Sequence, residues 1–182
     1  MPLPVSVTVV PAFLARGYHV RVDIPAHIAD SGRYDVTVTP ALGPDPQIVR
    51  VLVDRLLESG WRPGDAVVLA AAGSADRLAQ RDLRLVATQL SAALGERVEL
   101  AYTAVTAATS EPSVVDAVAA LRSSGRRVII ASYLLADGLF QDRLHCAGAD
   151  IVTKPLGTHP GTARLIASRF RRAAVLTQAR AS

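Results

Sequence analysis

Imidazole and thiol groups are the side chains best able to bind a borderline metal or carry a proton near neutral pH. This chain has four histidines and one cysteine. His19 stands two residues after Gly17 in "PAFLARGYHVRVDIPAHI" (11–28), and Asp23 and Pro25 follow it closely. Taken alone, His19 is most simply an exposed loop histidine, so the residues around it must decide whether it has a function.

The remaining histidines and the cysteine lack the spacing of a metal site. His145 and Cys146 are adjacent, and no ligand pair such as C-x-x-C accompanies them. A metal site built from these residues is the lesser alternative. The simpler interpretation makes Cys146 a small packed side chain, His159 a residue of a helix N-cap region and His27 a surface residue.

A glycine–serine turn, Gly73-Ser74, falls between a predicted strand and a predicted helix. Backbone N–H groups at a helix N-terminus attract anions, so this turn is a candidate anion site. Neither G-x-x-x-x-G-K-[ST] nor G-x-G-x-x-G is present, which excludes both common phosphate loops. A plain strand-to-helix turn is the alternative.

Composition and charge narrow the class of protein. Hydrophobic residues make up 50% of the 182 and charged residues 20%, which is typical of a globular chain with a sizeable core. The net charge of +4 comes from scattered arginines and only 4% of residues are aromatic, so no nucleic-acid partner is expected. No apolar run reaches the ~18 residues of a membrane span, and no signal peptide is recognisable. A single cysteine predicts a reducing, cytoplasmic location.

Strand-like and helix-like segments must position these residues, and the two kinds alternate along the chain. The predicted strands are short runs rich in Val, Ile and Ala, at 5–10, 35–39, 66–71, 98–102, 127–133 and 150–153. The predicted helices begin at the N-caps Asp45, Asp76 and Ser110 and at Pro160, and end at Gly60, Gly95, Gly125 and Arg172. This alternation predicts an α/β fold with a parallel sheet and helices on both sides.

The chain also contains an internal repeat. "VTPALGPDPQIVRVLVDRL" (38–56) aligns with "VTKPLGTHPGTARLIASRF" (152–170) at an offset of 114, and "FLARG" (13–17) aligns with "LLADG" (134–138) at an offset of 121. Only the second copy follows a further strand–helix–strand–helix unit. We therefore expect a partial first lobe over 1–60, the back half of a duplicated lobe, and a complete second lobe over 61–182.

These segments resemble the sirohydrochlorin chelatases. "PAFLARGYHVRVDIP" is similar to the P-x-F-L-x-x-G-x-H-x-x-x-D-I-P segment of that family, and "SYLLADGLFQDRL" with "GADIVTKPLGTHP" is similar to the second lobe of its fused two-lobe members. "AAAGSAD" (70–76) stands where lobes of the family begin with G-H-G-S-R-D. The resemblance covers nearly the whole chain, and it implies chelatase-like three-layer αβα lobes with a cleft between them.

The resemblance implies a class II chelatase, a lyase that inserts a divalent metal into a tetrapyrrole without ATP. The metal is substrate (Co²⁺ or Fe²⁺, with Ni²⁺ a further candidate), no organic cofactor is implied, and the pathways are those of cobalamin and sirohaem. His19 matches the motif histidine, so it is implied to be the metal ligand and catalytic base. Asp23 would orient the imidazole, and Gly17 would allow a sharp turn before it.

The implied tetrapyrrole carries many carboxylates, which arginine side chains and backbone N–H groups suit. Arg16 and Arg21 are the expected substrate contacts, together with Gly73 and Ser74 of the glycine–serine turn. Lys154 is a further cation near the implied cleft. Each of these has the plain alternative of a surface or turn residue.

The sequence departs from the family pattern in the second lobe. The position of the family's other histidine is Ala72, and the counterpart of His19 is Phe140. No acidic residue precedes Glu111 in "AYTAVTAATSEP" (101–112), where the family has one. A non-catalytic paralogue that binds metal or tetrapyrrole therefore stays open, as does a structural partner of a full-length chelatase. A half lobe leaves sheet edges uncovered, which predicts a homodimer.

Overall fold

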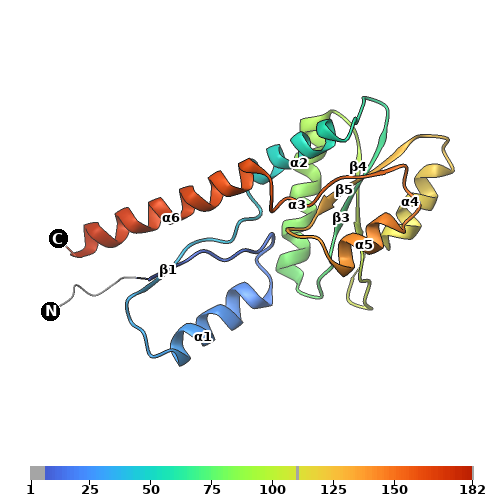
Figure 1. Cartoon of the computed structure of the whole chain (residues 1–182). Helices are drawn as coiled ribbons and strands as arrows, with labels where there is room; N and C mark the ends of the chain where they lie inside the picture. The colour runs from blue at the N-terminus through green and yellow to red at the C-terminus, as the bar shows by residue number, and fades with distance from the viewer. Residues whose placement is uncertain (1–6, 110, 182) are drawn as a thin grey trace.

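A four-stranded parallel sheet forms the larger part of the molecule (Figure 1). The computed structural model describes residues 7–109 and 111–181, with side chains as far as Val175. The strands β3 (Ala66–Ala71), β4 (Val98–Tyr102), β5 (Val128–Tyr133) and β6 (Ile151–Val152) lie in the order β4-β3-β5-β6. Every neighbouring pair is parallel. All residues of β3 and β5 are buried, as expected for central strands with both faces covered.

Helices cover both faces of this sheet. α2 (Pro46–Glu58) and α3 (Arg77–Leu94) pack on one face, where they form the larger apolar core. α4 (Val114–Arg122) and α5 (Leu139–His145) pack on the opposite face. Successive residues of β3 point alternately into the two cores. The predicted α/β three-layer fold with parallel strands is confirmed.

A second, two-stranded sheet lies beside the first (Figure 1). β1 (Val7–Val9) pairs in parallel with β2 (Val36–Val38). Between them the chain forms a π-helical turn, η1 (His19–Asp23), which continues into α1 (Ile24–Asp30). The long C-terminal helix α6 (Pro160–Ala181) packs against β1, β2 and α2, and Figure 1 shows it on the opposite side of β1 from α1.

The aligned segments of the internal repeat occupy equivalent places. We call β1, η1, α1, β2 and α2 (7–58) the N-terminal repeat, and β5, α5, β6 and α6 (128–181) the C-terminal repeat. The Thr39 N–H donates to the Val9 carbonyl at 2.9 Å, and the Thr153 N–H donates to the Ile130 carbonyl at the same distance. These pairs are related by the two sequence offsets, so the offsets describe one backbone arrangement that occurs twice.

A glycine in each repeat makes the same close backbone contact. A Cβ placed on Gly43 would lie 2.2 Å from the Leu14 carbonyl oxygen, and one on Gly157 would lie 2.1 Å from the Leu135 carbonyl oxygen. Leu14 and Leu135 are themselves aligned in the repeat. The "LG" pair that follows the second strand of each repeat is thus explained by sterics, because no side chain fits there.

The two repeats exchange their helices. α2 of the N-terminal repeat contributes Ile48, Leu52 and Leu56 to the core of the four-stranded sheet. α6 of the C-terminal repeat instead packs against the two-stranded sheet. The division into lobes at residue 60 stays a prediction. The apolar core of the four-stranded sheet contains residues from both sides of that boundary.

Several predicted helix ends are confirmed. Asp45 caps α2 by accepting from the Gln47 N–H at 2.8 Å. Asp76 caps α3 by accepting from the N–H groups of two residues in its first turn. Gly95 ends α3 in the left-handed conformation, at φ +67°.

The start of α4 differs from the prediction. The predicted cap Ser110 lies outside the described residues, and the observed N-cap is Ser113, whose hydroxyl accepts from the Asp116 N–H. Pro112, expected within the first turn, precedes the helix instead. Its carbonyl accepts from the Tyr102 N–H, so this segment is held in extended form against the end of β4.

The connections and the last helix also differ from expectation. Residues 19–30 and 139–145 were expected as connections and are helical. α6 extends nine residues beyond the predicted end at Arg172. Among the described residues, no helix is both long and apolar enough to cross a bilayer.

Candidate active site

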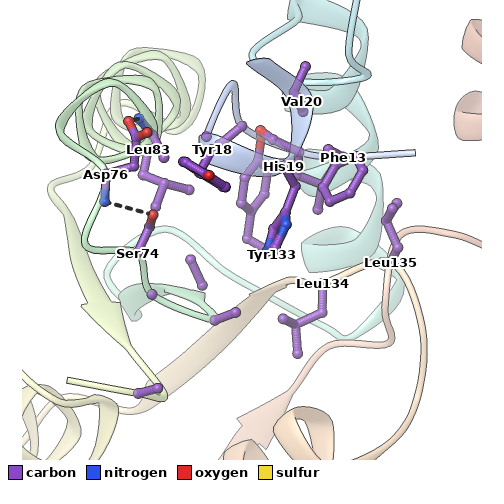
Figure 2. Close-up of a pocket in the computed structure, with 18 of the residues that line it drawn as sticks. Phe13, Tyr18, His19, Val20, Ser74, Asp76, Leu83, Tyr133, Leu134 and Leu135 are labelled. Atoms are coloured by element: carbon purple, nitrogen blue, oxygen red, sulfur yellow. Dashed lines mark hydrogen bonds between the residues drawn. The ribbon is translucent and has the colours of Figure 1, made fainter. Parts of the chain in front are cut away.

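A cleft of about 600 Å³ lies between the N-terminal repeat and the carboxyl ends of β3 and β5 (Figure 2). One wall is formed by residues 12–15 and 17–20, in the segment that leads from β1 into η1. The other wall is formed by the last residue of each central strand and the residues that follow it, 71–76 and 133–135, together with Phe140 of α5. Parallel sheets place ligands at the carboxyl ends of their strands, because the loops there diverge and leave a crevice.

His19 lines this cleft as the first residue of η1. Its side chain is 72% exposed, and its Nδ1 lies 2.5 Å from Asp23 Oδ2. Asp23 is the last residue of the same helical turn, so the spacing of four brings the two side chains onto one face. The carboxylate fixes the ring and its tautomer, which leaves Nε2 as the nitrogen available to a ligand.

Two aromatic rings border the imidazole. The Phe13 ring is stacked with it at a centroid distance of 6.0 Å, and the Tyr18 ring meets it edge-on at 6.3 Å. Figure 2 shows His19 beside Phe13, with its ring directed into the cleft. The sequence predicted His19 in a loop, whereas η1 holds it in a helical turn with a defined orientation.

Arg16 and Arg21, the predicted substrate contacts, are both bound to carboxylates of α3. Asp82 accepts from the Arg16 backbone N–H and from Nε and Nη2 of its guanidinium. Asp76 accepts from Arg21 Nη2, and this hydrogen bond holds the pKa of Asp76 below its usual value. These bonds attach the segment that carries His19 to the start of α3. The described lining of the cleft includes neither arginine, and Lys154 is absent from it too.

Gly73 and Ser74 line the cleft, and the structure gives both a role in the turn itself. Gly73 has φ +102°, and a Cβ there would lie 2.3 Å from the Ala104 carbonyl oxygen. The Ser74 hydroxyl accepts from the Asp76 N–H at 3.1 Å. Their predicted contact with an anion stays a prediction.

The expected role of Gly17 is corrected. Its backbone lies outside the left-handed region, so no sharp turn requires it. A Cβ at Gly17 would instead sit 3.4 Å from the Ala79 Cβ and 4.0 Å from the Ser74 hydroxyl. These are ordinary van der Waals distances, so a methyl group at this position would pack against the start of α3 without a clash.

Tyr133 is a cleft residue that sequence reasoning missed. Its hydroxyl donates to the Leu14 carbonyl at 2.8 Å, which joins β5 to the segment before His19. Burial raises the pKa of this phenol, so it stays a donor at any ordinary pH. Its position as the last residue of a buried strand was the only signal in the sequence.

The other histidines and Cys146 lie outside the cleft lining. His159 is buried and caps α6, with Nδ1 accepting from the Gly161 N–H at 3.1 Å, as its N-cap prediction implies. The prediction that Cys146 is packed was wrong, because it lies exposed at the end of α5. His27 is exposed on α1, as expected.

No group of three or more His, Cys, Asp or Glu side chains within the described residues is arranged to hold a metal ion. His19 with Asp23 is therefore an open arrangement that offers one imidazole nitrogen to a cation. A cation bound there must take its other ligands from water or from a bound molecule. This suits a metal that is passed on as substrate better than a resident structural metal.

Comparison with solved structures shows the same fold. The chain superposes on "SirB from Bacillus subtilis with Fe3+" with a TM-score of 0.79 at 23% identity, covering 94% of this chain and 73% of that one. A cobalt complex of the sirohydrochlorin chelatase SirB from Bacillus subtilis subspecies spizizenii gives 0.67 at 19% identity, covering 92% and 68%. "CbiX, the terminal Enzyme for Biosynthesis of Siroheme in Denitrifying Bacteria" gives 0.70 at 20%, covering 92% and 76%.

Sequence comparison assigns the family. No curated protein gives a significant sequence match. The CbiX family model, however, matches residues 5–59 and again 66–173, which together make up most of the chain. The chain therefore belongs to the CbiX family.

Proposed function

We propose that this protein is a sirohydrochlorin-type chelatase, a lyase that inserts Co²⁺ or Fe²⁺ into an anionic tetrapyrrole without ATP. One observation carries the proposal: an imidazole fixed by Asp23 points into a cleft at the carboxyl ends of the central strands. Membership of the CbiX family and the metal-bound neighbours support it.

His19 supplies the chemistry that metal insertion requires from the protein. The metal ion must lose water, the pyrrole N–H groups must lose their protons, and the ring nitrogens then bind the ion. The neutral imidazole has one free lone pair, on Nε2, which either ligates the incoming ion or accepts one pyrrole proton, and the second pyrrole proton passes to water. Asp23, held to Nδ1, keeps the ring oriented in either role.

The site is one-sided. The C-terminal repeat has Phe140 where the N-terminal repeat has His19, and Ala72, directly after β3, stands at the other position where the family has a histidine. One imidazole therefore approaches the macrocycle from one wall of the cleft. The replacement of both family histidines in the second lobe, by Ala72 and Phe140, favours a second candidate, a non-catalytic paralogue that binds metal or tetrapyrrole.

Metal insertion into sirohydrochlorin, followed by absorbance with Co²⁺ or Fe²⁺, separates the two candidates. The wild-type protein should insert metal faster than the buffer background, and His19→Ala should lower the rate by about 100-fold, as expected for a lost acid–base group. His27→Ala is the matched control, since His27 is exposed on α1 outside the cleft lining. A wild-type rate equal to background would exclude the enzyme, and equal rates for wild type and His19→Ala would exclude the role of His19.

Two further properties belong to this proposal. The protein forms a homodimer, because among the described strands β1 pairs only with β2 and its other edge has no strand partner. It acts in the cytoplasm, where an exposed free thiol such as Cys146 stays reduced. Light scattering that shows a monomer at micromolar concentration would contradict the dimer.

A further inference from the structure

Phe140 and Arg143 form an exposed pair on α5, at the edge of the cleft. Phe140 lines the cleft and is 39% exposed, so part of its ring is open to a ligand. The Arg143 guanidinium lies over this ring, 5.6 Å from its centroid. The spacing of three on one helix brings the two side chains together.

Arg143 differs from the arginines that sequence reasoning favoured. Arg16 and Arg21 are held by Asp82 and Asp76. Among the ion pairs of the described residues, none involves Arg143, although Asp142 is its neighbour in the sequence. A ligand carboxylate can therefore bind Arg143 without displacing a protein carboxylate, whereas at Arg16 or Arg21 it must compete with one.

We propose that Phe140 and Arg143 bind the tetrapyrrole, the ring stacking on the macrocycle and the guanidinium pairing with a peripheral carboxylate. Both surfaces suit a flat, polyanionic ligand, because an aromatic face offers stacking and a neighbouring cation offers charge. Phe140 aligns with His19 in the internal repeat. The N-terminal repeat would therefore supply the metal ligand, and the C-terminal repeat would supply the stacking ring. This inference rests on the proposed function for the identity of the ligand.

The test is the affinity for metal-free sirohydrochlorin, measured by absorbance or by quenching of protein fluorescence, with no metal present. Phe140→Ala should weaken binding about tenfold, as for loss of one stacked aromatic ring. Arg143→Gln should weaken it about fivefold, the upper end for an exposed ion pair. Arg143→Gln should also make the affinity less sensitive to salt, because one screened ion pair is gone.

Arg171→Gln is the matched control, because Arg171 is exposed on α6, whereas Arg143 lies over the ring of Phe140, which lines the cleft. It should bind as the wild type does, with the same salt dependence. Circular dichroism should show that each variant keeps the wild-type fold, since both side chains are exposed.

The outcomes separate this inference from the proposed function. Wild-type affinity and salt dependence in Arg143→Gln, with wild-type affinity in Phe140→Ala, would overturn the inference while metal insertion could still proceed. Weakened binding by both variants in a protein that inserts no metal would support the inference and exclude the enzyme. If the wild-type protein does not bind the macrocycle at all, both proposals fail.

Discussion

The N-terminal and C-terminal repeats share one backbone arrangement and differ in the segment that follows their first strand. In both, parallel strands keep one register, a glycine packs on a leucine carbonyl, and a side chain caps the helix that follows. The segment after the first strand differs. It forms η1 and α1 in the N-terminal repeat and only the short α5 in the C-terminal repeat.

The charges of that segment are reversed between the repeats. Arg16 and Arg21, which bind carboxylates of α3, align with Asp137 and Asp142. His19 aligns with Phe140. Leu14 and Leu135, whose carbonyls the two glycines contact, are repeated, whereas the charged residues and His19 of this segment have diverged. We conclude that geometry was kept in both copies and that the proposed metal chemistry was kept in one.

The largest expected effect, a loss of stability, tests the backbone arrangement that the two repeats share. Gly43→Ala and Gly157→Ala should each destabilise the protein by about 3 kcal/mol, because each new methyl would overlap a backbone carbonyl oxygen. Chemical denaturation measures the loss. Gly125→Ala is the control: it has φ +73° and open space around it, so only the backbone strain of roughly 1 kcal/mol applies. A large loss in only one of the two repeats would show that the two backbone arrangements are not equivalent.

The second prediction concerns the attachment to α3. Arg16→Ala should cost about 2 kcal/mol in the free energy of unfolding, because Asp82 is buried and loses its side-chain donors. Water can reach the half-exposed Arg16, which keeps the loss below that of a fully buried pair. Asp137→Ala, at the aligned position, should change stability by less than ~0.5 kcal/mol. Similar losses of unfolding free energy in the two variants would contradict the proposed difference between the repeats at these aligned positions.

The third prediction concerns the orientation of His19. Asp23→Ala should lower the rate of metal insertion about tenfold, and Asp23→Asn should lower it less, because an amide oxygen can still accept from Nδ1. Initial rates at saturating tetrapyrrole measure the effect. Asp30→Ala, an exposed carboxylate at the end of α1, should leave the rate unchanged. Equal rates for Asp23→Ala and wild type would show that the imidazole needs no fixed orientation.

The smallest effect is a pH dependence. Arg21 lowers the pKa of Asp76 in the folded state, so the bond stabilises the protein above the ordinary aspartate pKa of about 4. The contribution, less than ~1 kcal/mol, is lost as the pH falls through the lowered folded-state value. Arg21→Gln should therefore unfold at slightly higher pH in an acid titration followed by circular dichroism. Asp142→Asn, at the aligned position, should not move that midpoint in the same direction.

The sheet and the helix caps were predictable because their signals are local. Runs of buried β-branched residues identify central strands, and capping by Asp45 and Asp76 depends only on residues two or three positions away. The segment 19–30 was not predicted as helical, because it falls in the connection between the first two predicted strands. In the structure the helical stretch begins at His19, and Pro25 falls where the π-helical turn η1 passes into α1.

The candidate site was predictable only in part, because only some of its contacts join residues that are close in the sequence. His19 and Asp23 lie within one helical turn, so their motif could be read from the sequence. The bond from Tyr133 to Leu14 joins residues 119 positions apart, and the bonds from Arg16 to Asp82 join residues 66 apart. No local pattern encodes such contacts, which is why the two arginines were interpreted as substrate contacts.

The exchange of helices has a consequence for how this chain can be divided. α2 packs on the four-stranded sheet, whose strands follow it in the sequence. α6 packs on the two-stranded sheet, whose strands lie near the start of the chain. A protein cut at residue 60 would expose the apolar faces of both pieces, although the sequence predicts a boundary between lobes there. The two repeats should therefore melt in a single cooperative transition, and neither should survive as an independent module if recombination separates it from the other.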